Sequence, residues 1–340
     1  MIKYLGSKRT LLPSIEQAVR QLGEVRSVID LFSGTSRVGH HLKKCGYQVF
    51  SNDINTYAFQ IASCYVVSDK EDHLDIQKNI DYMNTISPKA GYFTETFCEK
   101  SQFFQPKNGA KVDAIREWID TQNFPYETKA ILLTSLMEAA DRVDSTCGIQ
   151  MAYLKKWAPR SFNDLELRVP EIVPRSPFGK SSATQMDARL AAQKLSADVA
   201  YLDPPYNQHK YLGNYHIWET LVCWDKPDVY GVACKRTDVR ERKSAFNQKK
   251  QIVTAMKEMI QDLDVRHLIV SFSNEGYISK DEMMEILSSR GDVFVFEKEY
   301  KRYVGAQIGI HNPQGNKVGE VSHLDNKEYI FLVSDTGKQP

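Results

Sequence analysis

The sequence predicts an α/β fold, in which a mostly parallel sheet is flanked by helices and interrupted by a long helical insertion. Residues 27–53 carry the pattern strand, glycine turn, helix, strand, which is the unit of doubly wound sheets. Residues 197–202 are a short apolar run that ends at two prolines, as a buried parallel strand would. Between these stretches, the early part of an insertion over residues 56–180 shows helical spacing.

Composition limits the classes of function. The 340 residues are 42% hydrophobic and 26% charged, as in an ordinary globular protein with room for one large domain and an insertion. A net charge of +1 means that any contact with nucleic acid depends on local basic patches. The six cysteines form no CxxC pair and no Cys–His cluster, which predicts free thiols, a reducing cytoplasm and no metal site. We expect no signal peptide and no membrane segment, because a motif begins at Tyr4 and no long apolar span follows.

The first half of the sheet contains a turn suited to a ligand. Strand 27–32 leads into Gly34, a helix covers residues 38–45, and strand 47–51 ends next to Asp53. Gly34 allows close approach of a ligand to the backbone, and the helix start favours an anionic group. Asp53 stands 19 positions after Gly34, near the offset at which an acid binds a ribose. Since G-x-G-x-x-G is absent, the unit predicts an adenosine-containing cofactor without saying which.

The tetrapeptide Asp203, Pro204, Pro205 and Tyr206 follows the apolar strand. The two prolines fix a rigid turn at the carboxyl end of the strand, where open α/β sheets bind their ligands. An acid, a proline carbonyl and an aromatic ring on one stiff loop suit a planar base that carries an amino group. A strand-ending turn whose acid caps the next helix remains the alternative.

A third motif opens the chain, and the motifs together resemble a known family. Taken in order, four motifs resemble the D12 class of adenine-specific DNA methyltransferases, in the alpha-group order: Tyr-x-Gly-x-Lys at 4–8, Asp-Leu-Phe-Ser-Gly-Thr at 30–35, Asn-Asp at 52–53 and Asp-Pro-Pro-Tyr at 203–206. Further stretches are similar to modification methylases of the FokI type, namely 207–209, 215–216 and 271–275. The turn at Gly34 has one glycine where relatives often have several.

The resemblance implies a fold, a cofactor and partners. It implies the Rossmann-like sheet of class I S-adenosylmethionine-dependent methyltransferases, with a catalytic domain over residues 1–60 and 181–340. Residues 61–180 would form a largely helical inserted domain that recognises the DNA target. The implied cofactor is S-adenosyl-L-methionine and the implied partner is double-stranded DNA. A cognate restriction endonuclease would act separately, and we expect a cytoplasmic monomer.

The resemblance also assigns roles to residues. Catalysis would rest on Asp203, Pro204, Pro205 and Tyr206, and the cofactor would contact Tyr4, Lys8, Asp30, Phe32, Gly34, Asp53, Asp187 and Asp203. Three of these have other interpretations: Tyr4 could simply pack the N-terminus, Asp53 could be a solvated turn residue, and Asp187 could cap a helix. Asp203 and the Pro204 carbonyl would accept hydrogen bonds from the amine of a flipped-out base stacked on Tyr206, so catalysis would be orientation and electrostatics. Asn207 and His209 are weaker candidates for holding the extruded nucleotide.

The remaining segments supply the DNA surface and close the sheet. Helical spacing marks residues 57–67, 111–120 and 129–143 of the insertion. Two stretches rich in cations are candidate DNA contacts, although such runs are usually solvated faces: Lys155, Lys156, Arg160, Arg168 and Arg175 in the insertion, and Lys235 and Arg236 after the tetrapeptide. The end of the chain predicts helices 246–263 and 280–289, a strand 268–272 and a hairpin of 293–299 with 329–333. The loop 305–323 either reaches DNA or is disordered.

Two other functions stay open on the sequence. Proline-proline-aromatic loops also serve RNA adenine and protein glutamine methyltransferases. A non-catalytic DNA-binding relative would keep the pocket without turnover, although every residue of the catalytic motif is present here.

Overall fold

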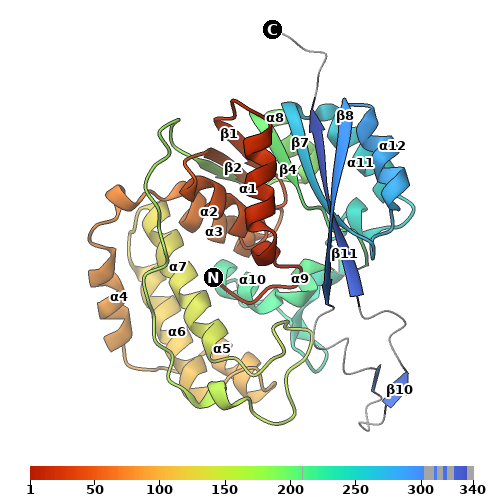
Figure 1. Ribbon diagram of the computed structural model, residues 1–340. Helices are drawn as coiled ribbons and strands as arrows, with labels where there is room; N and C mark the ends of the chain where they lie inside the picture. Colours follow the sequence, from red (N-terminus) through yellow and green to blue (C-terminus); the bar gives the residue numbers. More distant parts are fainter. Residues whose placement is uncertain (209, 302–309, 312–316, 320–324, 335–340) are drawn as a thin grey trace.

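A single seven-stranded sheet organises the protein (Figure 1). The computed structural model describes residues 1–208, 210–301, 310–311, 317–319 and 325–334. From one edge to the other the sheet contains, in order, β3 (Ser182–Thr184), β2 (Gln48–Asn52), β1 (Ser27–Asp30), β4 (Ser196–Leu202), β7 (Asp264–Ser273), β11 (Asp325–Ser334) and β8 (Asp292–Lys301). The predicted Rossmann-like α/β sheet is confirmed.

The direction of the strands determines where a ligand can bind. All neighbouring pairs are parallel except those of β11, which runs antiparallel to both β7 and β8. The chain passes from β1 to β2 on one side and returns through β4 on the other, so the strand order reverses between β1 and β4. Open α/β sheets bind ligands outside the carboxyl ends of the strands at such a point.

Helices cover both faces of the sheet. Helices α1 (Leu12–Gln21) and α2 (Arg37–Lys44) pack on one face, through a core that includes Ile15, Val19 and Leu42. The opposite face is covered by α8 (Ala188–Lys194), α11 (Ile252–Asp262) and α12 (Lys280–Ser288). Burying both faces explains why the central strands are almost continuously apolar.

The insertion has its own helical core, seen beside the sheet in orange and yellow in Figure 1. Its helices are α3 (Thr56–Ala62), which continues as a π-helical turn over Ser63–Val67, then α4 (Ile76–Thr85), α5 (Tyr92–Thr94), α6 (Pro106–Thr121) and α7 (Tyr126–Arg142). The same core buries Trp218 and Leu221 of α10 (His216–Cys223). The helical body is therefore built partly from chain that follows the tetrapeptide.

Several predicted elements change at their ends. The helix expected over 246–263 begins only at Ile252, because Ala245–Asn247 forms a separate 3-10 turn in which the Phe246 amide donates to the Ser244 hydroxyl. Residues 293–299 and 329–333 do pair as antiparallel strands. His209 and most of 305–323 lie outside the described residues; within that loop, β9 (Ile310–His311) and β10 (Lys317–Gly319) pair with each other.

Two further observations concern classes of site. Among the described residues, no helix combines the length and the apolar character needed to span a bilayer. All six cysteines are free thiols. Folding brings Glu16, His41 and Cys45 together, with their ligand atoms within 4.8 Å of one another, a Cys–His grouping that the linear sequence did not reveal.

Candidate functional site

A cavity of about 340 Å³ opens at the carboxyl edge of the sheet, beside the β1–β4 junction. Its walls come from stretches that are far apart in the chain, within residues 4–6, 31–34, 52–55, 185–188, 203–212 and 242–247. Of the residues predicted to hold a cofactor, six contribute to this lining: Tyr4, Phe32, Gly34, Asp53, Asp187 and Asp203. Lys8 and Asp30 line a smaller adjoining cavity of about 40 Å³.

The start of the chain is held across the cavity by aromatic stacking. The ring of Tyr4 stacks between those of Tyr211 and Tyr215, with centroid distances of 5.3 and 4.5 Å. The Tyr4 hydroxyl lies 3.1 Å from that of Tyr57, and the Leu5 amide donates to the Tyr215 hydroxyl at 2.5 Å. Tyr4 thus forms part of a packed wall as well as a face of the cavity.

The turn after β1 requires glycine and is held by an acid. Gly34 has φ +51°, and a Cβ atom placed there would lie 3.2 Å from the ring of Tyr4. Asp53 accepts a hydrogen bond from the Gly34 amide at 2.9 Å through Oδ2, and one from the Asn55 amide at 2.9 Å through Oδ1. Asp53, the acid predicted to bind the ribose, therefore also fixes the glycine turn and is not a solvated turn residue.

Asp203 stands at the end of β4, with 21% of its side chain exposed. Its Oδ1 atom lies 3.2 Å from Nζ of Lys8. The same ammonium is 3.2 Å from both carboxylate oxygens of Glu328, on β11. Lys8 was predicted to contact a cofactor or DNA; in the structure its buried ammonium lies between two carboxylates.

Burial makes the three acids of this region weaker acids than usual. It raises the pKa of Asp30 to about 7 and those of Asp53 and Asp203 to about 6. Asp30 also accepts a hydrogen bond from the Gly39 amide at 3.0 Å. Acidic and basic side chains face the cavity together, because its lining also includes Lys210, Arg242 and Lys243.

Two cavity residues have a structural contact as well. Asp187 caps α8 by accepting a hydrogen bond from the Arg189 amide at 3.0 Å, so the capping interpretation is confirmed although the residue also lines the cavity. Phe32 packs edge-on against Phe246, with ring centroids 5.1 Å apart. Phe246 belongs to the segment that follows the tetrapeptide and closes this end of the cavity.

The tetrapeptide loop is anchored to the neighbouring strand. The ring of Tyr206 packs edge-on against Phe272 of β7 at 5.5 Å, and the Tyr206 carbonyl accepts a hydrogen bond from the Tyr277 amide at 2.8 Å. Pro205 lines the cavity, whereas Tyr206 does not. A role for Tyr206 in stacking a base therefore stays a prediction.

All three insertion arginines predicted to contact DNA have carboxylate partners within the insertion. Arg160 binds Asp144 at 2.6 Å and the carbonyl of Thr146 at 2.6 Å. Arg168 pairs with Glu166 at 2.8 Å on the surface. Arg168 remains exposed, so a contact with DNA would require it to give up only the weak surface ion pair with Glu166.

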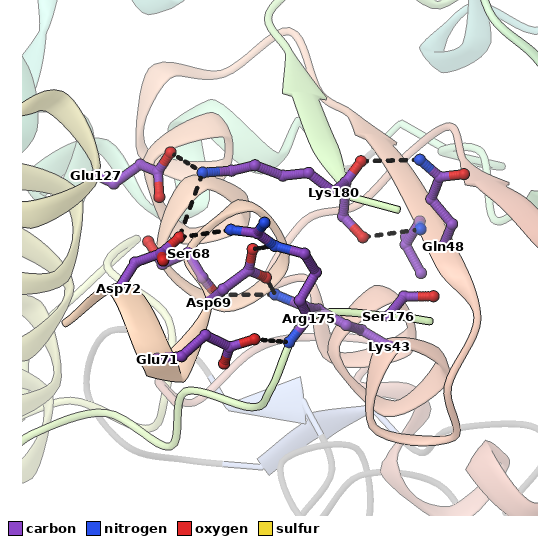
Figure 2. Close-up of polar contacts among 12 residues, drawn as sticks. Lys43, Gln48, Ser68, Asp69, Glu71, Asp72, Glu127, Arg175, Ser176 and Lys180 are labelled. Carbon is purple, nitrogen blue, oxygen red and sulfur yellow. Dashed lines mark hydrogen bonds and ion pairs between the residues drawn. The ribbon is translucent and has the colours of Figure 1, made fainter. Parts of the chain in front are cut away.

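Arg175 is part of an ion-pair network that joins the returning end of the insertion to α2 (Figure 2). Its Nε lies 2.6 Å from Asp69 Oδ2, and a second nitrogen lies 2.8 Å from Asp72. On its other side Asp69 binds Lys43 at 2.7 Å, and neither side chain of that pair is exposed. This geometry favours a structural role for Arg175 over contact with DNA bases.

Burial argues against one predicted phosphate contact. The side chain of Arg236 is 4% exposed and binds both Asp225 and Asp238, at 2.7 and 3.1 Å. Its charge is balanced inside the protein, so it does not reach a DNA backbone in this structure. Lys235 is half-buried with Nζ 3.1 Å from the sulfur of Met151, whereas Lys155 and Lys156 are exposed.

Sequence reasoning missed several residues of the site. Tyr211 and Arg242 line the cavity, and Glu328 binds Lys8. The fully buried Glu219 accepts hydrogen bonds from the amides of Thr56 and Tyr57 and pairs with Arg242 at 2.7 Å. An acid inside the apolar stretch of α10 was the one local signal for Glu219, and no local signal marked Glu328.

Comparisons with known proteins agree with the four ordered motifs. Residues 4–286 match the D12 class N6 adenine-specific DNA methyltransferase family. The modification methylase StsI of Streptococcus sanguinis is 31% identical, over 90% of this chain and 50% of its own length. The type II methyltransferase M.FokI of Planomicrobium okeanokoites is 29% identical, over 98% and 52%. For M.NlaIII of Neisseria lactamica the identity is 28%, over 96% of this chain and 100% of the relative.

The chain thus spans about half the length of StsI and M.FokI and the whole length of M.NlaIII. A solved structure described as the hMettl16 catalytic domain in complex with the MAT2A 3'UTR hairpin 1 aligns with 99% of this chain, at 11% identity and a TM-score of 0.34, values too low to support any argument. The match to the family over residues 4–286, which includes the cavity and the tetrapeptide, decides the assignment. The chain belongs to the D12 class of N6 adenine-specific DNA methyltransferases.

Proposed function

We propose that this chain transfers a methyl group from S-adenosyl-L-methionine to the exocyclic N6 amine of an adenine flipped out of duplex DNA. The observation that carries the proposal is the position of Asp203, partly exposed beside the cavity at the β1–β4 junction. The names of the relatives add the context of a restriction-modification system. In that context the enzyme works in the cytoplasm as a monomer, and a cognate endonuclease acts separately.

The groups that line the cavity suit the chemistry of the cofactor. Its lining includes the rings of Tyr4 and Phe32 and the carboxyls of Asp53 and Asp203. Aromatic faces and carboxylates attract the cationic sulfonium and ammonium groups, and Asp53 suits the ribose hydroxyls. Asp187 stands at the same cavity and suits the adenine end. When bound, the cofactor supplies an electrophilic methyl group.

The protein's own part in the reaction is orientation of the target amine. The lone pair of an aromatic amine is delocalised into the ring, which makes it a poor nucleophile. Hydrogen bonds from the amine to the Asp203 carboxylate and the Pro204 carbonyl would localise that lone pair and aim it. Both acceptors lie on a turn whose two prolines restrict the backbone, so little reorganisation is needed.

Recognition of DNA is assigned to the insertion and to the exposed cations near the cavity. We propose residues 61–180 as the target-recognition region, with Lys155, Lys156 and Arg168 as its exposed basic residues. After the tetrapeptide, the exposed residues Lys243, Lys249 and Lys250 replace the buried Arg236 as the expected phosphate contacts.

The test is methyl transfer from labelled cofactor to duplex DNA, total RNA and protein. We expect label in duplex DNA alone, as N6-methyladenine, and sequencing of DNA from an expressing host would then give the recognition site. Label in RNA or in glutamine would instead establish one of the other methyltransferase functions. Cofactor binding without transfer to any DNA would indicate a non-catalytic relative.

Substitutions should separate the cofactor site from the target site. Asp53→Asn removes a charge that faces the cavity and is expected to weaken cofactor binding by about 1.5–3 kcal/mol. Tyr206→Ala should leave cofactor affinity near normal, because Tyr206 does not line the cavity, and impair base capture by about 1–3 kcal/mol. Calorimetric titration of both variants measures this. Equal losses of cofactor affinity would mean that one of the two residues is misplaced.

DNA affinity should depend on salt through the exposed cations. Each phosphate contact contributes about 0.9 to the slope of log affinity against log salt. Lys243→Ala and Lys249→Ala are each expected to reduce that slope and to weaken cognate and scrambled duplexes alike. The control is Lys194→Ala, an exposed lysine outside the insertion that ends α8 just before β4 and so lies at the edge of the sheet opposite to the cavity. A control that lowers the slope as much would refute this choice of surface.

A further inference from the structure

Both ends of the described chain converge on Asp203. Lys8 belongs to a 3-10 turn at the start (Lys8–Thr10), and Glu328 belongs to β11, the last strand of the sheet. The Lys8 ammonium is 3.2 Å from Asp203 Oδ1 and 3.2 Å from both oxygens of Glu328. The side chains of Lys8 and Glu328 are 5% and 7% exposed. One cation is thus shared by a buried and a partly exposed carboxylate.

The antiparallel direction of β11 places Glu328 there. Because β11 runs opposite to β7, its first residues lie at the carboxyl edge of the sheet, and Glu328 pairs with Ser273 at the end of β7. Side chains alternate along a strand, so Glu328 shares a face with Ile330 and Leu332. Those two residues pack in the α1 core, on the side from which Lys8 approaches.

The charges around Asp203 oppose one another. Burial raises the pKa of Asp203, Lys8 opposes that rise, and Glu328 adds to it. The two carboxylates outweigh burial at Lys8 and raise its pKa, so its ammonium stays charged. Four other titratable groups face the cluster: Asp30 of β1, Tyr201 of β4, Tyr206 of the tetrapeptide and Tyr211 of the short helix Tyr211–Asn214. Of these only Asp30 adds negative charge near neutral pH.

We propose that Glu328 is a positioning residue that acts through Lys8: it shares the ammonium with Asp203 Oδ1, so that Lys8 only partly offsets the Asp203 charge, and it thereby sets the pH range in which the Asp203 carboxylate accepts the target amine. The inference rests on the proposed role of Asp203 in adenine methylation. Without Glu328, Lys8 would pair with Asp203 alone. The carboxylate would then be a weaker acceptor that stays charged to lower pH.

The test uses Glu328→Gln, which keeps the shape of the side chain and removes its charge. In the wild type, kcat/KM for methyl transfer should fall as the pH drops through about 6, because protonated Asp203 no longer accepts from the amine. In Glu328→Gln we expect that midpoint to move to lower pH by on the order of one unit. A carboxyl titration by ¹³C NMR, with the Asp203 signal identified from Asp203→Asn, should show the same shift without any turnover.

The matched control is Glu297→Gln, the same substitution on the adjacent strand β8. Glu297 is partly exposed and pairs with Lys280 and Lys327, not with Lys8. We expect its midpoint to equal that of the wild type. Lower activity of Glu328→Gln at every pH with an unmoved midpoint would mean that Glu328 is merely structural, and would overturn the proposal.

Two outcomes need separate readouts. Should Glu328→Gln not fold, Glu328→Asp retracts the charge from Lys8 and should give a smaller shift in the same direction, so an unmoved midpoint in that variant also overturns the proposal. Should the wild type methylate no DNA, the proposed function fails. The NMR titration would still show whether Glu328 controls Asp203.

Discussion

Replacing Asp203 by alanine is expected to reduce methyl transfer by about a hundred- to a thousand-fold. Removing one preorganised hydrogen-bonding group from an active site typically costs about 2.7–4 kcal/mol of transition-state stabilisation. The carboxylate is one of two acceptors proposed for the target amine, and the other is a backbone carbonyl that mutation leaves in place. Single-turnover rates with saturating cofactor and duplex DNA give the measurement.

The loss should be one of chemistry and not of folding. Lys8 keeps Glu328 as a partner in Asp203→Ala, so no buried ammonium is left without a counter-charge. Unfolding by urea should therefore occur near the wild-type midpoint. Near wild-type turnover in a folded Asp203→Ala protein would show that Asp203 does not orient the amine.

Replacing Asp69 by alanine is expected to lower the free energy of unfolding by about 3–5 kcal/mol, the range for removing one partner of a buried ion pair. The Lys43 ammonium, 2.7 Å from Asp69 and fully buried, would keep only the Ser68 carbonyl as an acceptor, at 2.8 Å. Arg175 would lose its Asp69 partner as well. Urea unfolding at neutral pH measures the change through the midpoint and slope.

A neighbouring residue provides the control. Asp72 binds Arg175 and Lys180 from an exposed position, and Asp72→Ala should cost about 1 kcal/mol or less. A Lys43→Met, Asp69→Leu double variant removes both buried charges and should recover much of the lost stability. If Asp69→Ala and Asp72→Ala were equally mild, the network of Figure 2 would not hold the insertion to α2.

Local patterns identified the elements that carry the site. The strands at Ser27–Asp30, Gln48–Asn52 and Ser196–Leu202 lie within two residues of their predicted bounds, because each is an apolar run between strong turn signals. Helix α10 was missed, because its eight residues are buried on nearly all sides, the polar ones included, so no exposed polar face marks a helical period. The helix becomes evident only in the folded structure, where the segment packs between the sheet and the insertion.

Charge along the chain did not reveal which cations are available to DNA. Arg236 and Lys243 belong to the same basic run, but Arg236 is buried against two carboxylates and Lys243 is exposed at the cavity. Arg175 is a candidate DNA contact on the sequence, and in the structure it pairs with Asp69. The carboxylates that pair with these arginines are distant in sequence or separated from them by a turn. Composition alone therefore does not give the net charge of the surface.

The sequence by itself determined the family, through four ordered motifs. It also determined the glycine turn and the rigid tetrapeptide, because each is a contiguous motif whose backbone geometry is fixed by its own residues. Only the tertiary structure decided which groups surround Asp203. Lys8 contacts Asp203 because α1 packs on the same face, and Glu328 contacts Lys8 because β11 enters the sheet antiparallel. Such contacts depend on strand order and register, which are set by the burial of whole faces and not by any local signal.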